Sequence, residues 1–232
     1  MLSRHFLRAK VLQTIYAQLS AGESNITAAR KSLDHNLNRL NELAALQLAA
    51  LREVVKAGRL VIAEGLNKHL PTQEDLNPSY AIVDNPFLTA LLQNFDYQQQ
   101  TEKYQFPWEL HDDVMRKMYL SFRKGPKFSE YLAIDEPTGD DHQRMVLNLF
   151  KHIINTEDFR DLFFDRSLLW EDDFDQIAQH NYAILKALDP FLLDASTPLR
   201  TMVDERDESD MEALRFAHQL LAEALSHVPE NE

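Results

Sequence analysis

The feature that most constrains this chain is a seam of residues spaced alternately four and three apart between positions 33 and 54. The seam comprises Leu33, Leu37, Leu40, Ala44, Gln47, Leu51 and Val54. This spacing places all its members along one side of an α-helix, as in a coiled coil. Because Leu43, Leu46 and Leu48 lie beside the seam, the helix is expected to be buried on more than one side. The sequence therefore predicts a long second helix.

The rest of the sequence also favours helices over strands. Only five of 232 residues are glycine, and leucine, alanine, glutamine and glutamate are abundant; these residues form helices readily. A first helix is expected from a Ser3 cap to about Leu19, ended by Gly22, and Pro71 stops the second. Shorter helices follow, so the predicted fold class is all-α, with helical bundles and additional stacked helices.

The breaks in this pattern divide the chain into four expected segments. Residues 1–70 form an N-terminal basic helical bundle with the long helix. Residues 71–141 hold a connector and inserted helices, and residues 142–203 form a second helical lobe. Residues 204–232 are expected to be an acidic linker followed by the start of an incomplete C-terminal module.

Charge is distributed unevenly along the chain, whose net charge is −13. Residues 1–60 contain nine Lys and Arg residues against four Asp and Glu residues, a net charge of +5. The other 172 residues contain 15 basic and 33 acidic residues, a net charge of −18. This asymmetry predicts that a polyanion would be met by the N-terminal part, although a charge excess is also compatible with an ordinary solvated surface.

The densest basic segment is the first predicted helix. Its candidate RNA-binding residues are Arg4, His5, Arg8, Lys10 and Gln13. Arg4 and Arg8 stand one turn apart on one face, where guanidinium groups suit phosphates and stack on bases. His and Gln side chains can read the edges of unpaired bases. A solvated basic face on an amphipathic helix is the competing interpretation.

The apolar residues of the same helix are expected to form its packing face. That face comprises Leu7, Val11, Leu12, Ile15, Tyr16 and Leu19, with Tyr16 as the anchor that locks the first helix to the second. Trp108, Trp170, Phe163 and Phe164 are expected to pack in the core or between lobes. Exposure of both phenylalanines would instead indicate a protein interface.

Three segments resemble the NusB family of transcription antitermination factors. The opening Arg-x3-Arg-x4-Gln-x2-Tyr, from Arg4 to Tyr16, resembles the family's first helix, although His5 replaces a family arginine. The connector from Asn67 to Pro78 and the segment from Trp170 to Leu185 resemble the long-form NusB proteins of one bacterial phylum. These matches occur in order and span most of the chain.

The resemblance implies a NusB-like helical bundle that binds boxA-like single-stranded RNA together with NusE, a ribosomal protein. The pair would join the RNA polymerase antitermination complex and act in the transcription of ribosomal RNA. The family's closing segment, Val-x-Ile-Asn-Glu-x-Ile-x-Ile-Ala-Lys and the turn after it, does not occur before Glu232. Either the chain is a fragment or shortened member, or its middle helices replace the last lobe.

Other function classes receive little support from the residues. No cysteine is present, which excludes disulfides, thiolate zinc sites and cysteine nucleophiles and favours a reducing, cytoplasmic location. We expect no membrane segment, metal or cofactor, and no enzymatic activity, because neither a Gly-rich phosphate loop nor a serine elbow occurs. Two alternatives stay open: a helical protein-interaction module without RNA affinity, built on the seam, and a NusB-like appendage of an RNA-modifying enzyme.

Overall fold

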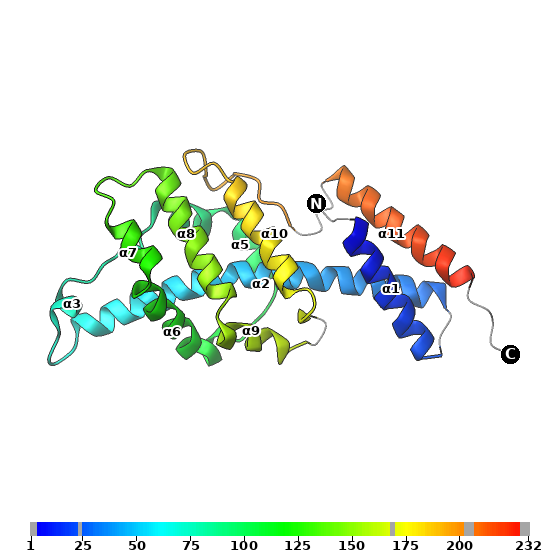
Figure 1. Cartoon of the computed structure of the whole chain (residues 1–232), viewed down its shortest axis with the longest axis horizontal. Coiled ribbons are helices and arrows are strands. Elements are labelled where there is room, and N and C mark those ends of the chain that lie inside the picture. Colours follow the sequence, from blue (N-terminus) through cyan, green and yellow to red (C-terminus); the bar gives the residue numbers. More distant parts are fainter. Residues whose placement is uncertain (1–3, 23–24, 168–169, 202–206, 228–232) are drawn as a thin grey trace. The chain divides into compact units, whose positions relative to one another are not determined.

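The computed structural model describes residues 4–22, 25–167, 170–201 and 207–227, excepting the side chains of residues 4 and 5. Within these ranges the protein is all-helical, which confirms the predicted fold class (Figure 1). The elements are α1 (Arg4–Ser20), α2 (Ile26–Leu66), α3 (Gln73–Leu76), α4 (Pro86–Gln93), α5 (Phe95–Lys103), the 3₁₀ helix η1 (Trp108–His111), α6 (Asp112–Arg123), α7 (Pro126–Leu132), α8 (Gly139–Ile154), α9 (Glu157–Phe164), α10 (Phe174–Ala187) and α11 (Glu208–Ser226).

The long second helix is confirmed, and local chemistry explains where it starts. Gly22 adopts a φ of +71° in the turn after α1, a conformation that glycine tolerates best. Asn25 then caps α2, because its side-chain oxygen accepts hydrogen bonds from the backbone N–H groups of Thr27 and Ala28. The resulting helix is 41 residues long, and its predicted seam is buried throughout.

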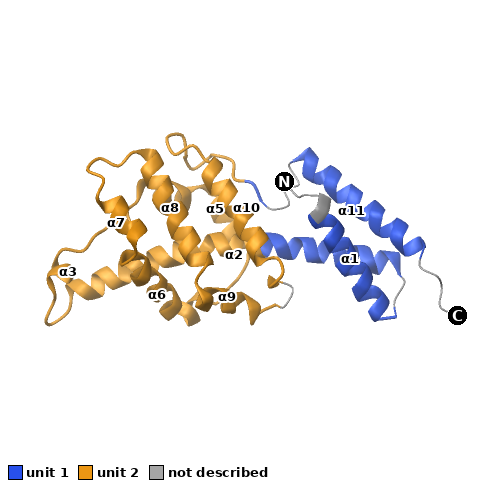
Figure 2. Cartoon of the chain, in the orientation of Figure 1, with its two compact units in different colours: residues 1–42, 200–232 blue, residues 43–199 orange. Residues whose placement is uncertain are grey.

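The chain divides into two compact units, coloured separately in Figure 2. Unit 1 comprises residues 1–42 and 200–232, and unit 2 comprises residues 43–199. This division differs from the four segments expected from the sequence. The physical reason is that α2 contributes to both units, while α11 joins the N-terminal helices instead of opening a separate module.

Unit 1 is built from α1, the first part of α2, and α11. Figure 1 shows α1 and α11 side by side, and many of their residues are in contact. The buried apolar residues of this unit are Phe6, Leu7, Val11, Ala29, Leu33, Leu37, Leu40, Ala217, Leu221 and Leu225. The N-terminus of α11 is capped by Asp207, which accepts hydrogen bonds from the N–H groups of Ser209 and Asp210. The hydrogen bond from the Ser209 side chain is the main cause of the lowered pKa of Asp207.

Unit 2 has an aromatic core between α9 and α10. Its centre is Phe163, whose ring lies within 6 Å, centroid to centroid, of the rings of Phe106, Phe159, Trp170 and Phe174. Phe163 is buried and Phe164 is half-buried, so the phenylalanine pair is not an exposed interface. The two tryptophans are also buried, as predicted.

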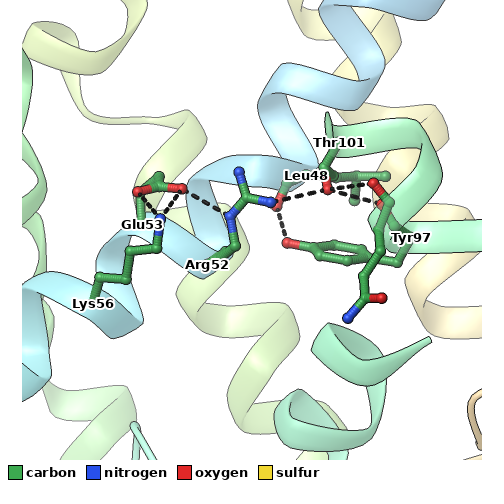
Figure 3. A network of polar contacts seen from close by, with 7 residues as sticks. Leu48, Arg52, Glu53, Lys56, Tyr97 and Thr101 are labelled. Carbon is green, nitrogen blue, oxygen red and sulfur yellow. Dashed lines mark hydrogen bonds and ion pairs between the residues drawn. The ribbon is translucent and has the colours of Figure 1, made fainter. Parts of the chain in front are cut away.

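Polar groups buried along α2 in unit 2 are satisfied by defined partners. Gln47 donates to the carbonyl of Phe174 at 3.0 Å and accepts from Asn181 at 3.1 Å. In Figure 3 the hydroxyl of Tyr97 donates to the carbonyl of Leu48 at 2.9 Å. These bonds fix the helices around α2 in register, because a mismatched arrangement would leave buried groups unpaired.

Acidification is expected to destabilise unit 2 through His142 and His152. Packing desolvates both imidazoles and lowers the pKa of each below the ordinary value of 6.5; Asp141 opposes this for His142. Their ring nitrogens lie 2.7 Å from the hydroxyls of Tyr131 and Ser121, respectively. Because the unfolded chain binds more protons below pH 6.5, these groups stabilise the fold fully above 6.5. Their contribution is lost as the pH falls through the folded pKa.

Thermal unfolding measured between about pH 5 and pH 8 tests this expectation. The midpoint should fall on the acidic side, and a variant with His142→Gln and His152→Gln should fall less. An unfolding midpoint that rises below pH 6.5, or an identical decline in the double variant, would contradict it.

Candidate nucleic-acid interface

The candidate interface lies on α1, which contains three basic residues and no acidic residue. Arg8 is exposed, and its guanidinium carbon lies 5.8 Å from the centroid of the Phe216 ring on α11. This cation–π contact restricts the side chain while its N–H groups stay accessible. Arg4 and His5 belong to α1 by their backbone, but their side chains lie outside the described residues.

Lys10 has a different environment from the one expected for a phosphate contact. It is only 5% exposed, and its Nζ lies 5.4 Å from the centroid of the Phe6 ring. The ammonium donates a hydrogen bond to Oε1 of Gln13 at 3.0 Å. Lys10 therefore packs along its aliphatic stem and orients Gln13, and in this conformation it does not present its charge at the surface.

Gln13 is exposed, as a base-reading side chain must be. Because its amide oxygen accepts the hydrogen bond from Lys10, the amide nitrogen is the group that it offers outward. That nitrogen can donate to a carbonyl or ring nitrogen at the edge of an unpaired base. The exposed part of the candidate site thus combines the Arg8 guanidinium with a donor from Gln13.

The prediction for the packing face of α1 is partly wrong. Leu12 is 67% exposed and Tyr16 is 73% exposed, so Tyr16 does not anchor α1 to α2. The buried face instead includes Lys10 and Thr14, whose hydroxyl donates to the carbonyl of Lys10 at 2.9 Å. The predicted stripe spans roughly half the helix circumference at 100° per residue, which is too wide for one packing face.

Sequence reasoning missed this exposed apolar row of Leu12, Tyr16 and Leu19. Their spacing of four and three follows one side of α1. An apolar row beside a basic one suits either stacking with bases or contact with a protein. The spacing was visible in the sequence, but nothing there distinguished a buried row from an exposed one.

Other kinds of site would each need a particular grouping of side chains among the described residues. No group of three His, Asp or Glu residues placed to hold a metal ion occurs there, and no described helix is long and apolar enough to cross a membrane. Ser121 and His152 form a close pair with Oγ and Nε2 2.7 Å apart. However, the Ser121 hydroxyl also lies 3.1 Å from the carbonyl of Met118, and no described carboxylate is hydrogen-bonded to His152. The orienting group of a catalytic triad is therefore lacking in this part of the chain.

The interface on α1 is thus the strongest candidate. Its exposed side chains include Arg8 and Gln13, with Tyr16 between them around the helix. Its backbone also carries Arg4 and His5 in the first turn of the helix. No protein-family model, no curated protein and no solved structure matches this chain.

Proposed function

We propose that this chain is an RNA-binding transcription antitermination factor of the NusB type, with α1 as its RNA contact. The observation that carries the proposal is the charge of α1. This helix has three basic residues and no acidic one in a chain of net charge −13. A polyanion approaching such a chain is repelled by most of it and attracted by a locally basic segment.

The proposed contact assigns different roles to the exposed side chains. Arg8 binds a phosphate or stacks on a base, and Gln13 donates to a base edge. Arg4, one helical turn before Arg8, and His5, next to it in the sequence, are proposed to add further contacts. Lys10 supports the site from within by holding Gln13. Because bases must be unpaired for such reading, single-stranded RNA is the ligand class that fits best.

The resemblance to NusB proteins supplies the rest of the proposal. The RNA would be boxA-like, the protein partner would be NusE, and the pair would act within the RNA polymerase antitermination complex during ribosomal RNA transcription. Binding of labelled boxA-type RNA should exceed binding of a scrambled control, weaken with salt, and strengthen when NusE is added. Equal binding of both RNAs, or none, would count against this function.

The combined substitutions Arg4→Ala and Arg8→Ala are expected to weaken RNA binding by about ten-fold or more. Arg8 is exposed, so helicity should be unchanged by circular dichroism. Affinity is measured by fluorescence anisotropy with the boxA-type RNA. Arg144→Ala with Lys186→Ala is the matched control, because it removes two exposed positive charges from unit 2. If both variants lost RNA affinity equally, the loss would reflect net charge and not a site on α1. If the variant with Arg4→Ala and Arg8→Ala kept its affinity, the assignment of the RNA site to α1 would be wrong.

The exposed row of Leu12, Tyr16 and Leu19 favours a second candidate, a protein-interaction module without RNA affinity. The heptad seam does not supply its surface, because that seam is buried within the chain. Replacing Leu12 and Leu19 by serine separates the candidates. An interaction module loses its partner and shows no RNA binding before or after the change, whereas an RNA-binding factor keeps its salt-sensitive affinity for RNA.

A further inference from the structure

The short helix α3 is held in unit 2 by charge and not by burial. None of its residues is buried. Glu74 pairs with Arg123 of α6 at 2.5 Å, and Asp75 pairs with Lys68, just after α2, at 2.7 Å. In each pair one partner, Glu74 or Lys68, is exposed, and ion pairs with an exposed partner are weak and are screened by salt. The attachment of α3 is therefore much easier to release than that of a helix with an apolar face.

α3 approaches α2 closely at Gly65, near the end of α2. A Cβ atom at this position would lie 2.9 Å from Oδ1 of Asp75. The same carboxylate closes a capping box with Thr72. Hydrogen bonds from Lys68, the largest cause, and from Thr72 lower the pKa of Asp75 to about 2. Asp75 thus stays ionised at any physiological pH and keeps its negative charge beside Lys68.

Beneath α3 is an open cavity of about 330 Å³ lined by residues from α2 and α6 and the segments after them. Its basic lining comprises Lys68, Arg116, Arg123 and Lys124, and its acidic lining comprises Glu64, Glu74 and Asp75. Two of the three carboxylates belong to α3. If α3 moved away, Arg116 would keep its ion pair with Glu64 of α2. The other three basic residues of the lining would lose their acidic neighbours from α3.

This concentration of positive charge is unusual for unit 2. Residues 43–199 contain 15 Lys and Arg residues against 25 Asp and Glu residues, a net charge of −10. Arg116 and Arg123 are seven residues apart and lie on one side of α6. Lys124 is exposed and has no ion-pair partner among the described side chains. A surface of this kind, with two arginines and two lysines around one cavity, suits consecutive phosphates of a polyanion.

We propose that α3 is a built-in acidic occupant of a phosphate-binding face, and that this face binds the backbone of single-stranded RNA when α3 leaves. Glu74 and Asp75 take the places of two phosphates. RNA binding at unit 2 is thereby kept weak until a high local RNA concentration, such as that created by capture at α1, competes with α3. The identity of the polyanion as RNA rests on the proposed function, whereas the masking of the basic face rests on the geometry of unit 2.

The test neutralises α3 in a full-length chain that already carries Arg4→Ala and Arg8→Ala, so that α1 contributes little. Glu74→Gln and Asp75→Asn remove both charges and preserve shape, and Asn keeps an acceptor for the Thr72 cap. Binding of a labelled oligouridylate is measured by anisotropy over a salt series. We expect affinity at low salt to rise by about ten-fold and the slope of log affinity against log salt to steepen by about 2.

A charge-matched control distinguishes between removal of the α3 carboxylates from the basic face and a general change in net charge. Asp135→Asn with Glu136→Gln makes the same change at two exposed residues that follow α7 and form no ion pair with any described side chain. This variant should gain little affinity. Adding Arg116→Gln and Lys124→Gln to the neutralised α3 variant should return binding to the starting level. Circular dichroism and thermal unfolding verify that every variant is folded.

Equal gains in the α3 variant and its control would overturn the proposal, as would no gain in either. Tighter binding of polyglutamate than of oligouridylate would overturn the assignment to RNA. These results are independent of the α1 site, because α1 is disabled in every variant compared. Conversely, if α1 failed to recognise boxA RNA while the α3 variant still gained affinity for oligouridylate, that gain would remain evidence for a polyanion site covered by α3.

Discussion

Replacing Phe163 by alanine is expected to lower the free energy of unfolding by about 3–5 kcal/mol. The ring is 0% exposed and lies 4.9 Å from the centroid of Phe159 and 5.6 Å from that of Phe174. Its removal deletes apolar contacts with several aromatic partners and leaves a cavity whose walls are rings from different helices. These rings cannot collapse together without moving α9 or α10. Urea unfolding followed by circular dichroism measures the loss.

The matched control for this change is Phe95→Ala, also in unit 2. The Phe95 side chain is 68% exposed, so its removal creates no cavity and should change stability by less than about 1 kcal/mol. The measurement would contradict the proposed core if Phe163→Ala were as mild as Phe95→Ala. The proposed core would also be contradicted if the two variants had the same urea midpoint of unfolding and differed only in the slope of unfolding free energy against urea concentration.

Replacing Gly58 by alanine is expected to destabilise the protein by about 1–3 kcal/mol. A Cβ atom at this position would lie 2.6 Å from Cε2 of Tyr119 and 2.9 Å from Cγ1 of Val83. Tyr119 is buried, so its ring cannot swing into solvent to relieve the overlap. The clash should outweigh the gain of about 1 kcal/mol that alanine brings to a helix interior.

Gly65→Ala makes the identical change in the same helix and serves as the control. The new Cβ would meet mainly the side chain of Asp75 on the weakly attached helix α3, which can shift without disturbing the core of unit 2. Gly65→Ala should therefore leave the unfolding midpoint unchanged or raise it. If Gly58→Ala also left the unfolding midpoint unchanged or raised it, α6 would not approach α2 as closely at Gly58 as described.

The central helix was predictable because its signal is long and repeated. The seam from Leu33 to Val54 identifies both the helix and its buried side. Glycine is a poor helix former, yet α2 continues through Gly58 and Gly65. A propensity describes the isolated chain, whereas tertiary contacts decide the outcome when Tyr119 occupies the space of the missing side chain.

The candidate interface was predicted less completely than the central helix. Exposure of Arg8 and Gln13 follows from their polarity. Burial of Lys10 does not, because it depends on Phe6 and Gln13 closing around a long aliphatic stem. The exposure of Tyr16 was missed for the opposite reason. An amphipathic pattern assigns every apolar residue to the core, although α1 has room for only part of them.

The basic cavity under α3 had no sequence signal at all. Its lining residues lie between positions 61 and 124, and each resembles an ordinary surface charge when read alone. Only the fold brings Lys68 near Arg123. The same holds for the carboxylates of α3, whose four residues are too few to show a helical period.

The discontinuity of unit 1 has a consequence for biosynthesis. Arg8 rests on Phe216, but a ribosome adding about 5–20 residues per second makes Phe216 roughly 10–40 s after Arg8. Residues 43–199 are all made before Phe216, so synthesis of unit 2 ends while α1 still lacks α11. A nascent chain therefore acquires its finished α1 surface only after α11 has been made. A truncation before α11 would leave an intact unit 2 beside an N-terminal helix whose apolar face is uncovered.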